Sequence, residues 1–248
     1  MNTKPIKSLG LLTGTALLAS LPLSGVAQSI LYNLDANSGT SPTYTGAAIL
    51  GSSGDLWNAF VAGSYVGSPT YFSLMDSTGS TAAGVQFAIW NNVGNYNNTG
   101  GSTANPMDLM SDYINAAAAG DGWPIKVEIS NLPTSTAFQL VVYAAGDTAG
   151  QGGTISLATD STFGTIIQSA NTTGASRDLS AGAGVAYQTF SGTTSASGTV
   201  DFEVANTSDW HALNGFQVQI TAVPEPSSLA LCGGGLVLLG VFRRLLSR

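Results

Sequence analysis

Histidine, acidic and hydroxyl side chains build most hydrolytic sites, and this sequence contains a single histidine, His211. It follows Asp209 and Trp210 directly, so a serine from elsewhere in the chain could complete a nucleophilic triad with Asp209 and His211. The chain has no Gly-x-Ser-x-Gly turn, which exposes the nucleophile in one large class of such hydrolases. We therefore expect His211 to be capped by local hydrogen bonds or exposed on a loop, and not to be a catalytic base.

Two glutamates, Glu128 and Glu203, are the carboxylates to consider for glycoside hydrolysis, which needs an acid and a second carboxylate across a cleft. Both alternate with apolar residues, Glu128 within 126–129 and Glu203 within 199–204. Alternation of this kind places acidic side chains on the solvated face of a strand. The sequence therefore predicts no catalytic residues and no enzyme. A polysaccharide hydrolase that uses Glu128, Glu203 or an aspartate is the alternative.

Calcium is the metal that the segment 35–39 could bind, because Asp35 and Asn37 stand two residues apart before Gly39. The glutamate that would complete a twelve-residue calcium loop is absent, and Asx-rich turns show the same spacing. We interpret the segment as a turn. The sequence therefore predicts neither a metal site nor a cofactor.

Two clusters combine aromatic rings with amide or carboxylate groups, which is the composition of a shallow sugar-binding surface. The candidate residues are Asp55, Trp57 and Asn58 in the first cluster, and Trp90, Asn91 and Tyr96 in the second. The rings would give flat apolar platforms, and the polar groups would orient sugar hydroxyls. For Trp57 or Trp90 taken alone, a place in the core is favoured over ligand contact.

The segment that must position these residues is 28–223, which is long enough for one sizeable core. It contains 13 acidic residues but only Lys126 and Arg177 as bases. This balance excludes a nucleic-acid-binding surface, and anionic polymers would need bridging cations. The single cysteine, Cys232, lies outside this segment, so the domain has no disulfide and must be stabilised by burial.

The two ends of the chain have the composition of targeting segments. Residues 1–27 carry Lys4 and Lys7, then an apolar run over 9–18, and then small residues up to Ala27. This order is typical of a secretory signal peptide. The sequence therefore predicts an exported protein whose mature chain begins at Gln28.

The other end contains Pro224, Glu225 and Pro226, an apolar stretch over 229–242, and a basic cluster. That cluster consists of Arg243, Arg244 and Arg248. The apolar stretch would reach only about 21 Å as a helix, against a hydrocarbon core of about 30 Å, so a span needs the flanks from 227 to 246. Arginines stay on the cytoplasmic side, which predicts a membrane-anchored tail and an outward-facing domain.

This tail resembles the PEP-CTERM sorting signal of exported proteins of Gram-negative bacteria. The likeness covers about the last 25 residues and rests on three ordered features: Pro224-Glu225-Pro226, the short apolar segment, and the terminal arginines. It implies handling by an exosortase, a membrane cysteine peptidase that cuts near the motif. It also implies delivery to the cell surface or extracellular matrix, where exopolysaccharide is the expected partner.

Between the ends, apolar and polar residues alternate and are separated by Gly, Pro and Asn, which predicts an antiparallel β-sandwich. The clearest strands are 126–129, 138–143, 199–204 and 216–220, and weaker ones are 30–34, 47–50, 70–74, 85–90, 154–158, 165–168 and 186–190. The first two strands look like a hairpin. In 199–204 and 216–220 one face should be packed and the other wet.

One segment should be helical. Asn105 and Pro106 form a helix start, and apolar residues recur at spacings of three and four up to the alanines at 116–119. With this helix packed on it, the domain is similar to a jelly-roll module of the galactose-binding-like kind. The likeness rests on the short stretches 54–58, 74–79, 109–114, 129–133 and 213–218.

These observations give one leading hypothesis and two alternatives. We expect an exported protein, held at the surface or in the matrix, with a non-catalytic jelly-roll for adhesion or weak glycan contact. A secreted polysaccharide hydrolase and a purely structural surface protein are the alternatives.

Overall fold

The computed structural model describes residues 29–39, 42–61, 69–81, 83–91, 94–97, 105–116, 123–205 and 210–221. They lie within one compact unit, Gln28–Val223. The expected signal peptide and the segment 224–248, with its sorting residues and arginines, lie outside the described residues. Within the described ranges, no helix is both long enough and apolar enough to cross a membrane.

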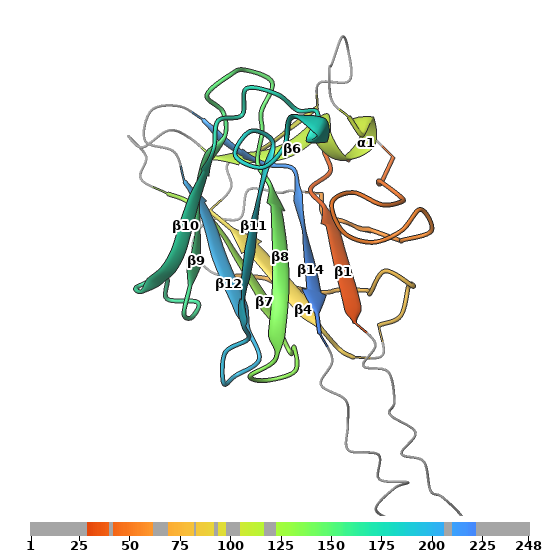
Figure 1. Ribbon diagram of the computed structural model, residues 1–248, viewed down its shortest axis with the longest axis vertical. Coiled ribbons are helices and arrows are strands. Elements are labelled where there is room, and N and C mark those ends of the chain that lie inside the picture. The colour runs from red at the N-terminus through yellow and green to blue at the C-terminus, as the bar shows by residue number, and fades with distance from the viewer. Residues whose placement is uncertain are drawn as a thin grey trace, which may run out of the picture. The chain divides into compact units, whose positions relative to one another are not determined.

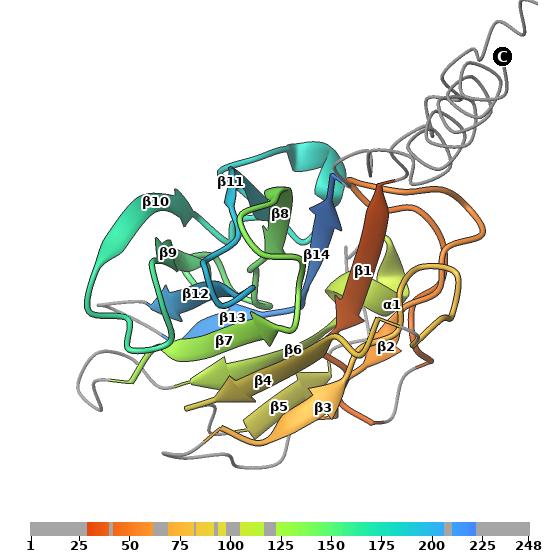
Figure 2. The same cartoon turned by 90° about the horizontal axis from the view of Figure 1, so that it is seen from below.

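Two sheets form a sandwich, with a smaller third sheet at one end (Figures 1 and 2). The first sheet has the order β11 (Tyr187–Thr193), β8 (Ala137–Tyr143), β14 (Gly215–Ile220), β1 (Ile30–Asp35) and β2 (Asn58–Ala59). The second has the order β10 (Ile166–Thr172), β9 (Gly153–Ala158), β12 (Val200–Ala205), β7 (Ile125–Ser130), β4 (Gln86–Trp90) and β3 (Tyr71–Ser73). The described part of the chain is therefore all-β.

The third sheet has the order β13 (His211–Leu213), β6 (Asp112–Ala116) and β5 (Gly94–Asn97). A one-turn helix, α1 (Met107–Met110), precedes β6, and a short 3-10 helix covers Leu179–Ala181. Neighbouring strands in the sheets are antiparallel, apart from β1 and β2, which run parallel. Figure 1 shows α1 and β6 at the same end of the sandwich.

The core lies between the two large sheets and follows from period-two alternation in their strands. Phe202 of β12 and Phe216 of β14 meet there edge to face, with their ring centroids 5.6 Å apart. Both rings are buried, together with their apolar neighbours at alternate positions. The strands predicted over 199–204 and 216–220 are confirmed, because one face of each buries valine, isoleucine or phenylalanine.

The other face of these two strands is only partly solvated, although alternation had predicted a wet face; Glu203 and Gln219 are partly exposed. Asp201 of β12 and Gln217 of β14 are both buried. Gln217 lies beneath the loop 42–57: its Oε1 accepts from the backbone N–H of Leu50 at 2.9 Å and from the Tyr143 hydroxyl, and its Nε2 donates to Asn33 Oδ1 at 2.9 Å. Alternation assigns side chains to faces but cannot say which faces a loop will cover.

That covering loop contains the predicted strand 47–50, which is wrong. Residues 48–50 form a bend instead. Ala48, Ile49 and Leu50 pack on a second apolar cluster, which is centred on Trp57, Tyr143 and the helix α1. The apolar residues 48–50 therefore cover the outer face of the first sheet.

The predicted hairpin of 126–129 with 138–143 is also wrong. Both strands exist, as β7 and β8, but they belong to different sheets. The connection turns at Asn131, which has a positive φ of 61°, and then buries Leu132 in the core. The connection therefore crosses from the second sheet to the first and places Leu132 in the core between them. The turn of a hairpin within one sheet would not need such a buried residue.

The short helix predicted after Asn105 is confirmed only over the four residues of α1. Residues 112–116 form strand β6 and pair with β5 on one side and β13 on the other. Ile114 enters the core between the sheets, while Tyr113 stacks on Tyr96 of β5. Opposite directions for adjacent side chains are a strand property, and pairing on both sides overrides the helical spacing of the methionines.

Candidate functional site

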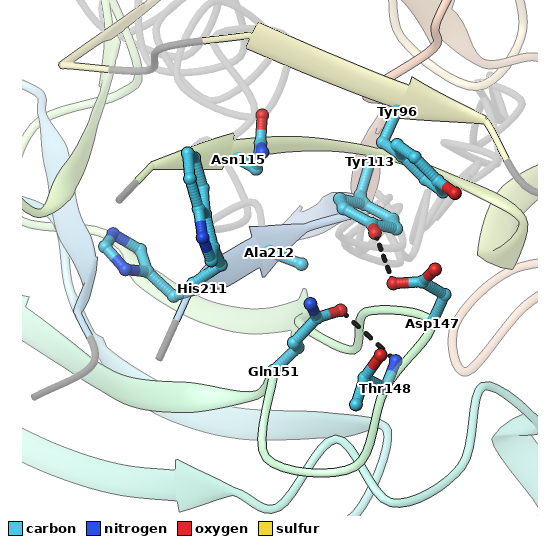
Figure 3. Close-up of a pocket in the computed structure, with 9 residues that line it drawn as sticks. Tyr96, Tyr113, Asn115, Asp147, Thr148, Gln151, His211 and Ala212 are labelled. Carbon is cyan, nitrogen blue, oxygen red and sulfur yellow. Dashed lines mark hydrogen bonds between the residues drawn. The ribbon is translucent and has the colours of Figure 1, made fainter. Parts of the chain in front are cut away.

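A pocket of about 270 Å³ opens at the end of the sandwich formed by the third sheet and the β8–β9 loop (Figure 3). The lining residues come from β5, β6, β13 and that loop. They are Tyr96, Tyr113, Asn115, Asp147, Thr148, Gln151, Trp210, His211 and Ala212. Segments that are far apart in the sequence therefore meet at one site.

The aromatic part of the pocket combines rigid packing with exposed ring surface. Tyr96 and Tyr113 face each other across β5 and β6 and stack with centroids 5.4 Å apart and an angle of 29° between the rings. Tyr113 is buried, whereas Tyr96 and Trp210 are each 44% exposed. The exposed ring of Tyr96 is therefore held by the buried Tyr113, and Trp210 adds a second exposed ring to the pocket.

The polar part centres on Asp147, which is exposed at the start of the β8–β9 loop. Its Oδ1 accepts a hydrogen bond of 2.8 Å from the Tyr113 hydroxyl, as Figure 3 shows. Burial raises the pKa of Tyr113, and the bond to the Asp147 carboxylate raises it further, so the phenol stays protonated. The Gln151 side chain accepts from the backbone N–H of Thr148 at 3.2 Å, which orders the same loop.

His211 is 2% exposed, and burial lowers its pKa to about 4. The backbone of Trp123 opposes this shift in part, and neither ring nitrogen has a hydrogen-bond partner among the residues that the structure describes. Figure 3 shows the imidazole turned away from Asp147. His211 is therefore a buried neutral residue, and the capped or exposed loop position expected from the sequence is wrong.

The structure places the first predicted sugar-binding cluster in ordinary structural roles. Trp57 is 4% exposed and donates from Nε1 to the Gly46 carbonyl at 2.9 Å. Asn58 is buried and bonds the backbones of Asn33 and Met75. Asp55 accepts from the backbone and hydroxyl of Ser52 in an exposed turn.

The second predicted cluster is divided by the fold. Trp90 is 6% exposed and packs edge to face on Phe163 at 5.7 Å. Asn91 occupies a left-handed turn position with a φ of 64°. Tyr96 alone of the six predicted residues lines the pocket. Asp147 and Trp210 also line the pocket, and both lie outside the strands. Nothing in the sequence around them marked them as site residues.

The acidic residues considered for hydrolysis lie on the outer face of the second sheet. Glu128 and Asp201 are direct cross-strand partners on β7 and β12, and both are buried. The Tyr71 hydroxyl donates to Glu128 Oε1 at 2.8 Å, and Thr199 Oγ1 donates to Asp201 Oδ2 at 2.7 Å. Burial raises the pKa of Glu203, while the charge of Lys126 lowers it. Glu128 and Asp201 are therefore largely closed to solvent, whereas Glu203 is partly exposed.

The segment considered for calcium is a turn whose Asn37 Oδ1 accepts from the backbone N–H of Gly39. Asp35 is buried, and burial raises its pKa to about 7, while the bond from the Tyr44 N–H opposes the shift. Among the described residues, no group of three or more His, Cys, Asp or Glu side chains is arranged to hold a metal.

Comparison with known proteins adds one specific finding. No curated protein matches the chain. The solved structure of the plant receptor-like kinase ANX2 matches at 10% identity and a TM-score of 0.32, over 47% of this chain and 32% of that one. The family model described as the PEP-CTERM protein-sorting motif matches residues 222–245. The resemblance seen in Pro224-Glu225-Pro226 and the residues after it is thereby confirmed: the chain carries a PEP-CTERM protein-sorting motif, which supports an exported protein that is sorted by an exosortase.

Proposed function

We propose that this exported protein is held at the cell surface or in the extracellular matrix, where its sandwich serves as a non-catalytic adhesion module that makes weak contact with exopolysaccharide. The observation that carries the proposal is the pocket, in which the exposed rings of Tyr96 and Trp210 lie beside the carboxylate of Asp147. In this proposal the sandwich is of the jelly-roll type, and the C-terminal apolar segment is the membrane anchor that precedes exosortase processing.

The size of the pocket supports contact that is weak and local. Its volume of about 270 Å³ lies just below the usual range of small-molecule sites, which starts near 300 Å³. Space of this size suits one sugar ring of a longer chain. A polymer that presents many rings to many copies of the protein on one surface would gain avidity without tight single sites.

The proposal that the module is not an enzyme rests on the groups around the pocket. Within the part of the chain that the structure describes, Asp147 is the only carboxylate that lines the pocket, and His211 is neutral above pH values near 4. Glycoside hydrolysis needs two carboxylates across the substrate. Appearance of new reducing ends when the full chain is incubated with polysaccharides would overturn the non-catalytic part of the proposal.

The Tyr96→Ala variant is expected to bind polysaccharide about 5- to 10-fold more weakly, since a stacking ring contributes on the order of 1 kcal/mol beyond its buried area. Ile167→Ala is the control, because Ile167 is an apolar side chain of β10 that is 52% exposed and does not line the pocket. Affinity electrophoresis of the full chain in gels that contain each polymer measures the effect. Equal losses in both variants would contradict a ligand role for the pocket.

Deleting residues 224–248 is expected to release soluble protein after signal removal, because the apolar segment and the arginines are lost together. Replacing Pro224, Glu225 and Pro226 by alanine is the matched control. That variant should stay with the membrane but escape processing, which the intact mass of the recovered protein reports. Membrane association of the deletion variant at the level of the parent would defeat the proposed anchor.

A further inference from the structure

We infer that the pocket lined by Tyr96, Trp210 and Asp147 selects an uncharged, hydroxyl-donating sugar ring and rejects uronic acids, with Asp147 as the residue that sets this preference. This inference rests on the proposed glycan contact and names the class of glycan. It follows from the charges and hydrogen-bonding groups in and around the pocket.

The pocket carries negative charge without a balancing cation. Asp147 is exposed at its rim, and His211 is neutral because burial lowers its pKa to about 4. Among the residues that the structure describes, no lysine or arginine lines the pocket. The Nζ of Lys126, on strand β7 of the second sheet, lies 4.7 Å from the ring centroid of Phe163. Arg177 is buried. A carboxylate on the ligand would therefore meet Asp147 with no positive group to offset the repulsion.

The Asp147 carboxylate is also held in place to accept hydrogen bonds. Its Oδ1 takes the hydroxyl hydrogen of Tyr113, which is buried and stacked on Tyr96. Figure 3 shows the other carboxylate oxygen directed away from Tyr113. Bonds from neutral hydroxyls to a carboxylate are roughly twice as strong as neutral pairs, so a ring with adjacent hydroxyls gains most there.

The expected order of affinity follows from these two features. The affinity for a neutral polymer should be at least about ten times the affinity for the same polymer carrying carboxylates. A factor of this size is expected from the repulsion between two unit charges near a protein surface. The difference should shrink at high salt, because Asp147 is exposed and its field is screened. Acidic polymers should gain affinity only when calcium is present to bridge the two carboxylates.

The test compares amylose, β-1,4-mannan and β-1,4-galactan, whose primary hydroxyls are free, with the same polymers after oxidation of those hydroxyls to carboxylates, in EDTA and in calcium. The full chain is used, with Asp147→Asn as the variant and Asp160→Asn as the control. Asp160 is exposed and makes the same change of charge, but it follows the far end of β9, about 20 Å along the strand from the β8–β9 loop. Retention in affinity gels gives the ratio of neutral to acidic binding in each case.

We expect Asp147→Asn to weaken binding of the neutral polymers about fivefold and to lower the neutral-to-acidic ratio about tenfold, with less than a twofold change in Asp160→Asn. Parent protein that binds an oxidised polymer in EDTA as tightly as its neutral form would overturn the inference while leaving glycan contact intact. An unchanged ratio in Asp147→Asn would overturn it as well. No retention of the parent protein on any polymer would overturn the proposed function, and the inference with it.

Discussion

At pH 8 the Asp201→Asn variant is expected to be more stable than the parent protein by up to about 4 kcal/mol, whereas at pH 4 the two should differ little. Asp201 is 1% exposed, and its Oδ1 has no hydrogen-bond partner. Burial raises its pKa to about 7, the Thr199 bond opposes the shift, and the charges of Glu128 and Asp160 add to it. Asparagine keeps the shape of the side chain and removes the charge.

The direction of this effect follows from where the proton is bound. The pKa of Asp201 is about 7 in the folded protein and near 3.8 in the unfolded chain, so between these values the folded state holds a proton that the unfolded state releases. Its contribution to stability is complete below pH 3.8 and is lost as the pH rises through 7. The variant has no such loss, and its advantage therefore grows from pH 4 to pH 8.

Urea unfolding of both proteins at pH 4, 6 and 8 measures the difference at each pH. The comparison is made at each pH because His211, with a pKa lowered to about 4, changes the stability of both proteins with the opposite sign between pH 6.5 and 4. Asp178→Asn is the control: its carboxylate is exposed, caps Ser180, and has a lowered pKa. A difference between Asp201→Asn and the parent that does not vary with pH would contradict the burial of this carboxyl.

Replacing Asn214 by alanine is expected to lower the free energy of unfolding by about 3 to 5 kcal/mol, because three buried backbone groups lose their partner at once. Asn214 is fully buried between β13 and β14. Its Oδ1 accepts from the backbone N–H of Ala145 at 2.8 Å, and its Nδ2 donates to the carbonyls of Asp112 at 2.8 Å and Met110 at 3.4 Å. One side chain therefore joins the helix α1, strand β6 and the end of β8.

The Asn171→Ala variant serves as the control, since Asn171 is exposed on β10 and its Oδ1 accepts a single bond from Thr154. We expect it to cost less than about 1 kcal/mol. Urea unfolding gives both values, and hydrogen exchange over residues 112–116 shows whether the third sheet opens first in Asn214→Ala. Equal stability of the two variants would contradict the role of Asn214 as a link between the elements.

Strand positions were predictable wherever apolar residues alternate, as in β12 and β14, because the side-chain period of a strand is a local property of the chain. Shorter elements carried too little signal. Strand β13 has three residues, and β6 was hidden by the helical spacing of Met107, Met110 and Ile114. Pairing between β6 and its two neighbours involves residues up to about 100 positions away, which no local pattern reports.

The candidate site shows the same limit. Tyr96 was recognised because an aromatic residue within an asparagine-rich segment is a local feature of the sequence. Its stacking on Tyr113, and the bond from Tyr113 to Asp147, depend on how β5, β6 and the β8–β9 loop come together. Trp57 and Trp90 show the converse, because composition alone could not choose between a core position and a platform.

The sequence by itself determined the sorting of this protein and the all-β class of its domain, since both are written in contiguous segments: the motif at 222–245 and the alternating strands. Only the tertiary structure decided which strands share a sheet, that Asp201 and Gln217 are buried, and that Tyr96, Trp210 and Asp147 line one pocket. The physical reason is that burial and pairing are set by contacts between distant segments, and these contacts exist only once the two sheets have packed.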